Sequence, residues 1–223
     1  MEFSFGIPTK IYFGKDCIAK NAGVLAAVGS KAMIVTGKHS AKASGALDDV
    51  TAVLEEEKKE YVIFDEIENN PSVETVAKAA DIARAEKIDF VIGIGGGSPI
   101  DAAKAMWAFY EYPEVTFEQL CTPFSFPKLR QKAKFVAIPS TSGTATEVTA
   151  FSVITDYAKG IKYPLADFEI TPDVAIVDPQ LVESLPIKQV AYTGMDALTH
   201  AIEAYVSTLN SPFTDPLAIK AIE

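Results

Sequence analysis

The sequence is poor in cysteine, in histidine and in basic residues. Its 223 residues include two cysteines, Cys17 and Cys121, which lie far apart and in no metal-binding spacing, so free thiols and a reducing compartment are expected. Lysine and arginine number 20 against 30 aspartates and glutamates, a formal net charge of −10. Because nucleic-acid phosphates are recognised by clustered basic side chains, this balance argues against nucleic-acid binding. Dinucleotide binding stays open, since backbone N–H groups hold phosphates without a basic surface.

Long apolar runs and a leader are missing as well. No apolar run reaches the roughly 18 residues that suggest a membrane span, and residues 1–15 lack the charged and apolar regions of a signal peptide. We therefore expect no membrane association and a cytoplasmic protein. With 48% hydrophobic and 22% charged residues, the chain is expected to fold around a packed core.

Short β-branched runs alternate with longer helical patterns, which is typical of βα units around a parallel sheet. The patterns predict helices at 40–57 and 72–85, a long loop or short helical segment over 113–127, and strands at 32–36, 61–64, 90–94, 135–138 and 174–177. From about Pro186 the pattern is helical alone. We predict an α/β fold with a domain boundary near residue 185, between a parallel-sheet domain over 1–185 and the start of an all-helical domain over 186–223. Asp215–Glu223 lacks a helix stop signal, so a truncated chain is expected.

Three glycines, Gly95–Gly97, follow the strand predicted at 90–94. Glycine allows positive φ and close approach of the backbone to a ligand. Ser98 is predicted to cap the next helix, with Asp101 completing a capping box. A helix N-terminus that faces a glycine turn is an anion site by geometry and by its dipole. The alternative is a tight turn with no ligand, because the pattern differs from the G-x-G-x-x-G fingerprint.

Six hydroxyl side chains lie within Ser140–Thr149, directly after the strand predicted at 135–138. Ligands of open α/β sheets bind at the carboxyl ends of the strands. Helix capping by Thr144 with Glu147 is also expected, but it uses one hydroxyl and leaves five. We therefore predict a cofactor role for this loop.

The end of the strand predicted at 32–36 bears on the choice of nucleotide. In dinucleotide folds, an acidic residue at such a position holds the ribose 2′-OH and repels a 2′-phosphate. Here Gly37 offers room and no negative charge, and Lys38, His39 and Ser40 can assist a phosphate. These residues favour NADP over NAD. A plain glycine turn with exposed neighbours is the alternative.

Asp196 and His200 stand four residues apart in a helical pattern. This spacing puts both side chains on one helix face, where they can share a cation. A carboxylate with an imidazole suits divalent Fe or Zn better than Mg or Ca. Alternatively, Asp196 caps the helix and His200 is satisfied in the core. A catalytic metal site usually needs three or more protein ligands, and this chain does not supply them all.

Four segments, taken together, resemble the iron-containing (group III) alcohol dehydrogenase family, in particular its butanol-dehydrogenase-like members. They are Pro8–Gly14, Gly95–Asp101, Ile138–Thr149 and Thr193–His200, in the right order over the whole chain. The resemblance implies a cofactor and a metal in the cleft between a Rossmann-like domain and an all-helical domain. It implies one Asp and three His as metal ligands, of which Asp196 and His200 match the first two and the others lie beyond the last residue.

The resemblance also implies the reaction. An NADP-dependent oxidoreductase would interconvert primary alcohols and aldehydes, with Fe²⁺, or alternatively Zn²⁺, as Lewis acid; we assign no general base. Asn70, Thr149 and Lys162 fall at the family's cofactor contacts, and Gly37 falls where NAD-preferring relatives carry Asp. The predicted cofactor residues are Gly37, Asn70, Gly96, Gly97, Ser98, Asp101, Ser140, Thr141, Thr144, Thr149 and Lys162.

The resemblance further implies two partners, a small alcohol or aldehyde and a second copy of the chain. The family suggests a homodimer in which the first strand exchanges or pairs at the interface. Two other functions stay open, a zinc-dependent polyol (glycerol-type) dehydrogenase and a nucleotide-binding module without catalysis. Because two of four metal ligands are present, we expect the chain as printed to bind cofactor without turnover.

Overall fold

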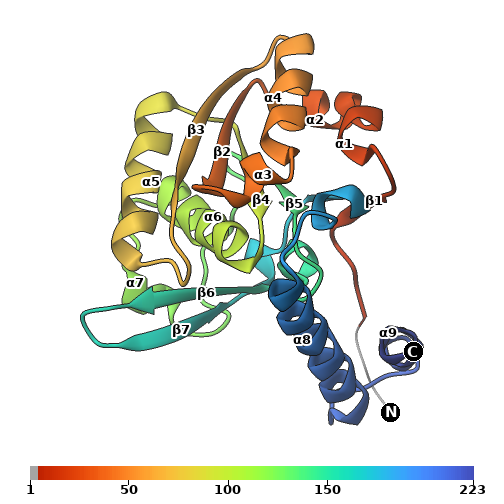
Figure 1. Cartoon of the computed structure of the whole chain (residues 1–223). Coiled ribbons are helices and arrows are strands. Elements are labelled where there is room, and N and C mark those ends of the chain that lie inside the picture. Colours follow the sequence, from red (N-terminus) through yellow and green to blue (C-terminus); the bar gives the residue numbers. More distant parts are fainter. Residues whose placement is uncertain (1–4) are drawn as a thin grey trace.

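A six-stranded parallel sheet forms the centre of the structure, a computed structural model that describes residues 5–223 (Figure 1). Residues 1–4, on which the signal-peptide prediction partly rests, lie outside the described residues. The strand order is β1-β8-β5-β4-β2-β3. The strands are β1 (Lys10–Phe13), β2 (Lys31–Gly37), β3 (Glu60–Ile67), β4 (Phe90–Gly95), β5 (Lys134–Pro139) and β8 (Val174–Val177). All five predicted strands are confirmed, and β1 is an additional edge strand.

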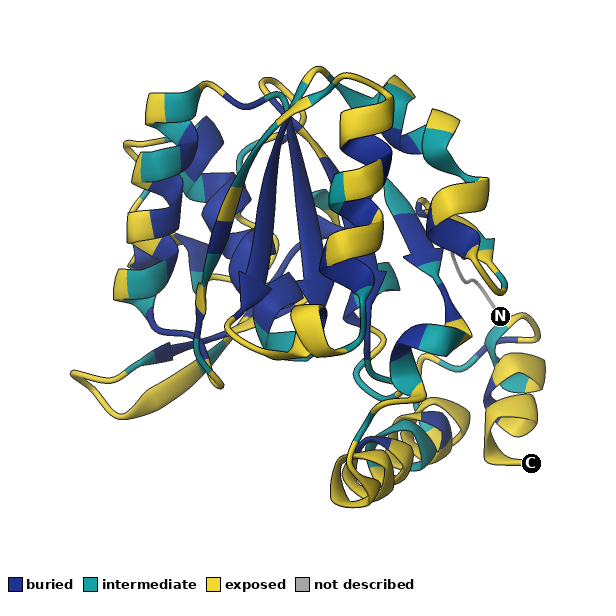
Figure 2. Ribbon diagram, turned by 45° about the horizontal axis from the view of Figure 1, so that its top comes forward, coloured by how far each residue is buried: buried dark blue, intermediate teal, exposed yellow. Residues whose placement is uncertain are grey.

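Helices cover both faces of this sheet, because successive strand residues point to opposite sides. Met33 and Val35 of β2 belong to one core cluster, which the helices α5 (Val73–Glu86) and α6 (Gly97–Glu111) complete. Ile34 belongs to a second cluster on the other face. That face is covered by α1 (Cys17–Lys20), α2 (Ala22–Val28), α3 (Ser40–Ala43) and α4 (Ala46–Glu56). Because both faces are covered, the central strands are buried throughout (Figure 2), and the predicted α/β class is confirmed.

The single helix predicted over 40–57 is wrong, because the structure has two helices there. Gly45 has φ +81° and stands as the N-cap of α4, so its backbone cannot continue α3. The helix predicted over 72–85 is confirmed as α5, and the Ser72 hydroxyl accepts a hydrogen bond from the Thr75 amide at its start. The short helical segment expected within 113–127 is α7 (Phe117–Leu120).

A β-hairpin that the sequence did not reveal projects from one end of the sheet (Figure 1). Its strands, β6 (Phe151–Asp156) and β7 (Ile161–Ala166), form a separate antiparallel sheet, with one isolated bridge from Thr155 to Ser72. Ile154 and Leu165 are buried against the α5/α6 side of the sheet. Three short 3-10 helices complete this part of the chain: η1 (Thr146–Val148), η2 (Phe168–Ile170) and η3 (Pro179–Val182). The hairpin therefore extends the body beside α6.

The last part of the chain is helical, as predicted. It consists of α8 (Ile187–Val206) and α9 (Thr214–Ile222), which pack against each other below the sheet (Figure 1). Figure 2 shows α8 largely exposed, and its buried residues are Thr193 and Ala201. No helix within residues 5–223 is long and apolar enough to cross a membrane. At the sheet edge, β1 pairs with β8 of its own chain, and the homodimer stays a prediction.

Candidate functional site

A cavity of about 790 Å³ opens at the carboxyl ends of β2, β3, β4 and β5. Its volume lies in the range of cofactor and small-molecule sites. The wall is formed by residues 37–40, 66–69 and 96–99, together with Ser140, Thr141, Thr144, Leu185, Pro186, Gln189 and Thr193. The structure therefore brings together seven of the predicted cofactor residues: Gly37, Gly96, Gly97, Ser98, Ser140, Thr141 and Thr144. The site lies at the sheet edge where ligands of open α/β folds bind.

The glycine turn packs directly against the hydroxyl-rich loop. A Cβ on Gly96 would lie 3.1 Å from Thr141 Cγ2, and a Cβ on Gly97 would lie 3.0 Å from Thr144 Cγ2. Both distances are tighter than most Cβ contacts, so neither position has room for a side chain unless its threonine moves. The two loops together form one wall of the cavity.

The predicted capping box at the start of α6 is wrong. The helix begins at Gly97 with Gly96 as N-cap, and no side chain of the described residues caps it. Ser98 lies within the first turn, where its hydroxyl accepts a hydrogen bond from the Asn70 amide at 3.3 Å. The first amides of α6 therefore have no side-chain acceptor, and the helix dipole favours an anion there. Losing the predicted cap strengthens the case for a phosphate site.

Ser140 supplies a second sign of a missing ligand. Its side chain is 2% exposed, and its hydroxyl has no hydrogen-bond partner among the described residues. Its amide donates to the Gly95 carbonyl at 2.8 Å, which holds the backbone of Ser140 beside the glycine turn at the cavity wall. A buried hydroxyl without a partner costs free energy. A polar ligand in the cavity would remove that cost, so the site fits a phosphate-bearing cofactor.

The capping of a helix by Thr144 and Glu147 is also wrong. The segment holds only η1, which follows Ala145 at φ +51° and has no side-chain cap. The Thr146 hydroxyl instead donates to Asp101 Oδ1 at 2.5 Å, and the Val153 amide donates to Asp101 Oδ2 at 3.0 Å. Asp101 thus connects α6 to η1 and β6 and does not line the cavity.

Lys104 is the residue that sequence reasoning missed. It is completely buried, and its ammonium donates to the carbonyls of Thr149 at 2.8 Å and Phe151 at 2.9 Å. Burial lowers the pKa of Lys104 to about 8, against the opposing attraction of Asp101 and Glu147. Burial likewise raises the pKa of both carboxyls. A lone lysine in the apolar run Ala102–Ala108, three residues after an aspartate, was the signal available in the sequence.

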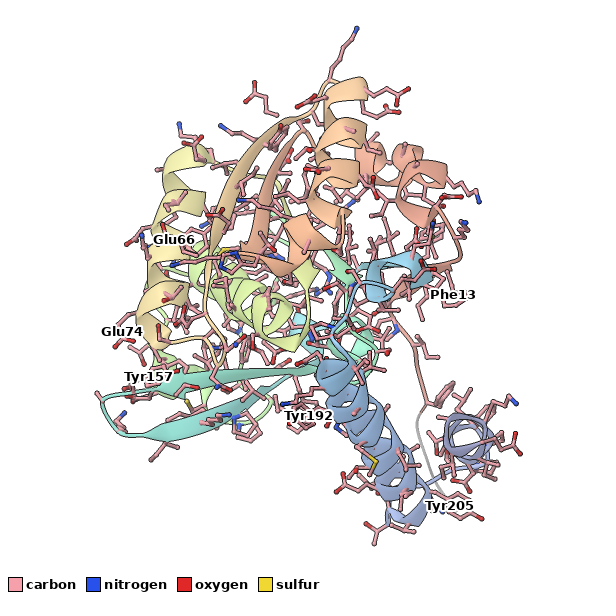
Figure 3. The ribbon with its side chains drawn as sticks, viewed as in Figure 1. Phe13, Glu66, Glu74, Tyr157, Tyr192 and Tyr205 are labelled. Carbon is pink, nitrogen blue, oxygen red and sulfur yellow. The ribbon has the colours of Figure 1, made fainter. Side chains whose placement is uncertain are left out.

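Asn70 and Lys162 meet at the side of the cavity. Lys162 Nζ donates to Asn70 Oδ1 at 2.7 Å, and the Tyr157 hydroxyl donates to the Asn70 carbonyl at 3.1 Å. Figure 3 shows Tyr157 on the hairpin beside the end of α5 that carries Glu74. These contacts join the hairpin to the loop after β3. Of the predicted cofactor residues, Asn70, Thr149 and Lys162 are not among those that line the cavity.

The end of the cavity beside β2 and β3 contains acidic side chains that bear on the choice of nucleotide. Glu66 and Glu68 line it with Lys38 and His39. Lys78 Nζ lies 2.6 Å from Glu66 Oε2. Burial alone would raise the pKa of Glu68, but hydrogen bonds from Ser72 and Thr75 lower it. Both carboxylates thus have partners of their own.

Asp196 and His200 lie on one face of α8, as predicted. His200 Nε2 is 3.7 Å from Asp196 Oδ1, and their side chains are 52% and 43% exposed. The core histidine and the helix cap are therefore excluded, since both groups face solvent in mid-helix. Within residues 5–223, no group of three or more His, Cys, Asp or Glu side chains surrounds a common point. The pair fits two ligands of a divalent metal and leaves the other positions open.

The fold and this arrangement define an α/β domain with a cavity at its strand ends, followed by a helical segment that carries an Asp–His pair. The model of the iron-containing alcohol dehydrogenase family matches residues 8–179. The C-terminal model of the Fe-containing alcohol dehydrogenase family matches residues 190–223. The chain belongs to the iron-containing alcohol dehydrogenase family.

The chain is also similar to individual members of this family. An NADPH-dependent butanol dehydrogenase of Clostridium saccharobutylicum is 59% identical over 219 residues, which are 98% of this chain and 56% of that protein. Among solved structures, an iron-containing alcohol dehydrogenase from Thermotoga maritima has a TM-score of 0.92 at 37% identity, covering 98% of this chain and 59% of that one. An NADH-dependent butanol dehydrogenase A of the same organism has a TM-score of 0.88 at 30% identity, covering 99% and 55%. The chain spans little more than half the length of these relatives.

Proposed function

We propose that this chain forms the cofactor half, with two metal ligands, of an NADP-dependent enzyme that interconverts primary alcohols and aldehydes. The proposal is based mainly on the composition of the cavity wall. It combines the uncapped start of α6 with the partnerless Ser140 hydroxyl at the carboxyl ends of parallel strands. The Clostridium relative is an NADPH-dependent butanol dehydrogenase, which supports a butanol-type substrate and NADPH for this chain.

The chain's own residues have distinct tasks in this proposal. The first amides of α6 and the Ser140 hydroxyl bind the cofactor phosphates, while Gly96 and Gly97 let the backbone approach them. Asp196 and His200 would hold a divalent metal, with Fe²⁺ favoured by the family and Zn²⁺ as the alternative. Such a metal supplies Lewis-acid polarisation of an alcohol or aldehyde oxygen. We place the boundary between the two domains near residue 185, supported by the family matches that end at 179 and begin at 190.

Ser140→Ala tests the cofactor site with effects of opposite sign. Removing a buried hydroxyl that has no partner is expected to leave the free energy of unfolding unchanged or slightly higher. The same change removes a hydrogen bond to a charged ligand, so the affinity for NADPH should fall about tenfold. Thermal unfolding and fluorescence titration of the 223-residue chain measure the two effects. Loss of stability with unchanged NADPH affinity would contradict the proposal.

Gly37→Asp tests the preference for NADP. Gly37 lies at the end of β2 in the cavity wall, and a carboxylate there would repel a 2′-phosphate and accept a hydrogen bond from a ribose 2′-OH. We expect the ratio of NADPH to NADH affinity to fall by about 10- to 100-fold, which corresponds to about 1.4–2.8 kcal/mol.

The matched control is Gly37→Ala. A Cβ at this position lies 3.2 Å from the Ile67 carbonyl oxygen, so both variants share the same crowding. The alanine variant is expected to weaken both cofactors equally. A ratio that is the same in the aspartate variant as in the alanine variant would remove the electrostatic basis for the preference.

A further inference from the structure

The loop that carries Thr141 and Thr144 touches α8 at a single glycine between them. A Cβ on Gly143 would lie 2.7 Å from both the Cβ and the carbonyl oxygen of Thr193, and 2.9 Å from its Cα. Real Cβ atoms do not approach other atoms this closely, and two of the three atoms met are backbone. A change of rotamer therefore cannot relieve the overlap, and a side chain at Gly143 requires the backbone of α8 or of the loop to shift.

Thr193 is a buried residue of α8 at the contact with this loop. It is 7% exposed and, with Ala201, one of the two buried residues of this helix. Its hydroxyl donates to the Gln189 carbonyl within α8, so no side-chain hydrogen bond of Thr193 reaches the loop. Figure 3 shows Tyr192 near the end of α8 beside the sheet, and Tyr205 at the far end beside α9. Close packing at Gly143 therefore sets where this end of α8 lies.

The same helix face carries the metal ligands. Asp196 and His200 follow Thr193 by three and seven residues, the spacing of side chains that share one face of a helix. Gln189, four residues before Thr193, lines the cavity with it. One stripe of α8 thus begins at the cofactor cavity, touches Gly143 and continues to Asp196 and His200.

We propose that Gly143 is a positioning residue that fixes the distance between the bound cofactor and the metal ligands by admitting the backbone of α8 at Thr193. The inference rests on the proposed function, since it assigns the purpose of that spacing to hydride transfer between substrate and cofactor. A methyl group at Gly143 displaces α8 by about 1 Å, the difference between the overlap and an ordinary contact. A misplacement of that size costs about 100-fold in rate when reacting groups must align.

The first test is Gly143→Ala in a chain that continues through the rest of the metal-binding domain. We expect kcat for alcohol oxidation to fall about 100-fold, while KM for NADP changes by less than about threefold, because the cofactor contacts beside Gly143 are kept. Gly23→Ala is the matched control: Gly23 lies in α2 with nothing within 4 Å of its added Cβ. A kcat equal to that of the control, or a KM for NADP that rises as much as kcat falls, overturns the proposal.

The second test uses the 223-residue chain and needs no activity. Amide hydrogen exchange of residues 190–200 should accelerate at least about tenfold in Gly143→Ala, with exchange in β2 and β4 unchanged. Thr193→Ala keeps the Cα, Cβ and carbonyl oxygen that approach Gly143, so it should accelerate exchange much less. Unchanged exchange in α8 overturns the positioning role. If the extended wild-type protein does not oxidise alcohols, the proposed function fails, and the exchange result alone still decides whether Gly143 positions α8.

Discussion

Replacing Asp196 or His200 by Ala, in a chain that continues through the metal-binding domain, is expected to abolish metal-dependent turnover. The two side chains are 3.7 Å apart on one exposed face of α8 and are the pair that we propose as metal ligands. Removing either takes away a charged or imidazole donor and, with it, several kcal/mol of Lewis-acid stabilisation. This loss corresponds to a decrease in kcat of about 1000-fold or more. Metal content per chain, measured by mass spectrometry, should fall in parallel.

His39→Ala is the control for this pair, because His39 is the other histidine of the chain and lines the cofactor cavity. It is expected to keep the full metal content. The 223-residue chain itself, which retains both ligands, should bind NADPH and give no measurable reduction of butanal with Fe²⁺ added. Turnover by that chain, or unchanged metal content in the Asp196 and His200 variants, would show that the metal lies elsewhere.

The parts of the fold that follow from local pattern were predictable. Strands β2, β4 and β5 are apolar runs buried on both faces, and such runs have few other stable conformations in a chain of this length. The position of Asp196 and His200 on one helix face was predictable as well, because it depends only on the geometry of a single helix. The glycine turn also followed from the sequence, because Gly95, at φ +138° and with Pro99 close by, adopts a backbone that other residues rarely take.

The parts that depend on distant contacts were not predictable. Asp101 was expected to cap its own helix, yet it accepts hydrogen bonds from Thr146 and Val153, more than 40 residues away in sequence. The hairpin β6–β7 has one buried and one exposed face only because α6 lies beside it. The contact of Gly143 with Thr193 joins segments 50 residues apart and has no local signature. The sequence spacing predicted which residues gather at the strand ends. The contacts that these residues make depend on the tertiary packing and could not be predicted from it.

The second large effect is expected from Lys104, whose lowered pKa makes the free energy of unfolding depend on pH. The ammonium is buried between the Thr149 and Phe151 carbonyls, and burial lowers its pKa from 10.5 to about 8. Between these values the unfolded chain binds a proton that the folded chain does not, so the free energy of unfolding rises with pH in this window. Across this window the free energy of unfolding is expected to rise by about 3 kcal/mol. Cys17, Cys121 and Tyr110, whose pKa values burial raises, oppose this trend in part of the same range.

Lys104→Met isolates the contribution of this one group. At pH 7 the variant is expected to be less stable by about 3 kcal/mol, because two carbonyls lose their donor and the buried Asp101 and Glu147 lose their positive neighbour. Its melting temperature should fall by about 10 °C. The difference from wild type, measured by urea unfolding, should grow to about 6 kcal/mol by pH 10.5, since only the wild type gains stability as Lys104 loses its proton. The opposing cysteine and tyrosine contributions are present in both proteins and cancel in this difference. Lys78→Met, at a surface lysine paired with Glu66, should change the free energy of unfolding by less than about 1 kcal/mol at pH 7. A difference for Lys104→Met that does not grow with pH would mean that Lys104 keeps an ordinary pKa and that its burial is fully compensated by the carboxyls beside it.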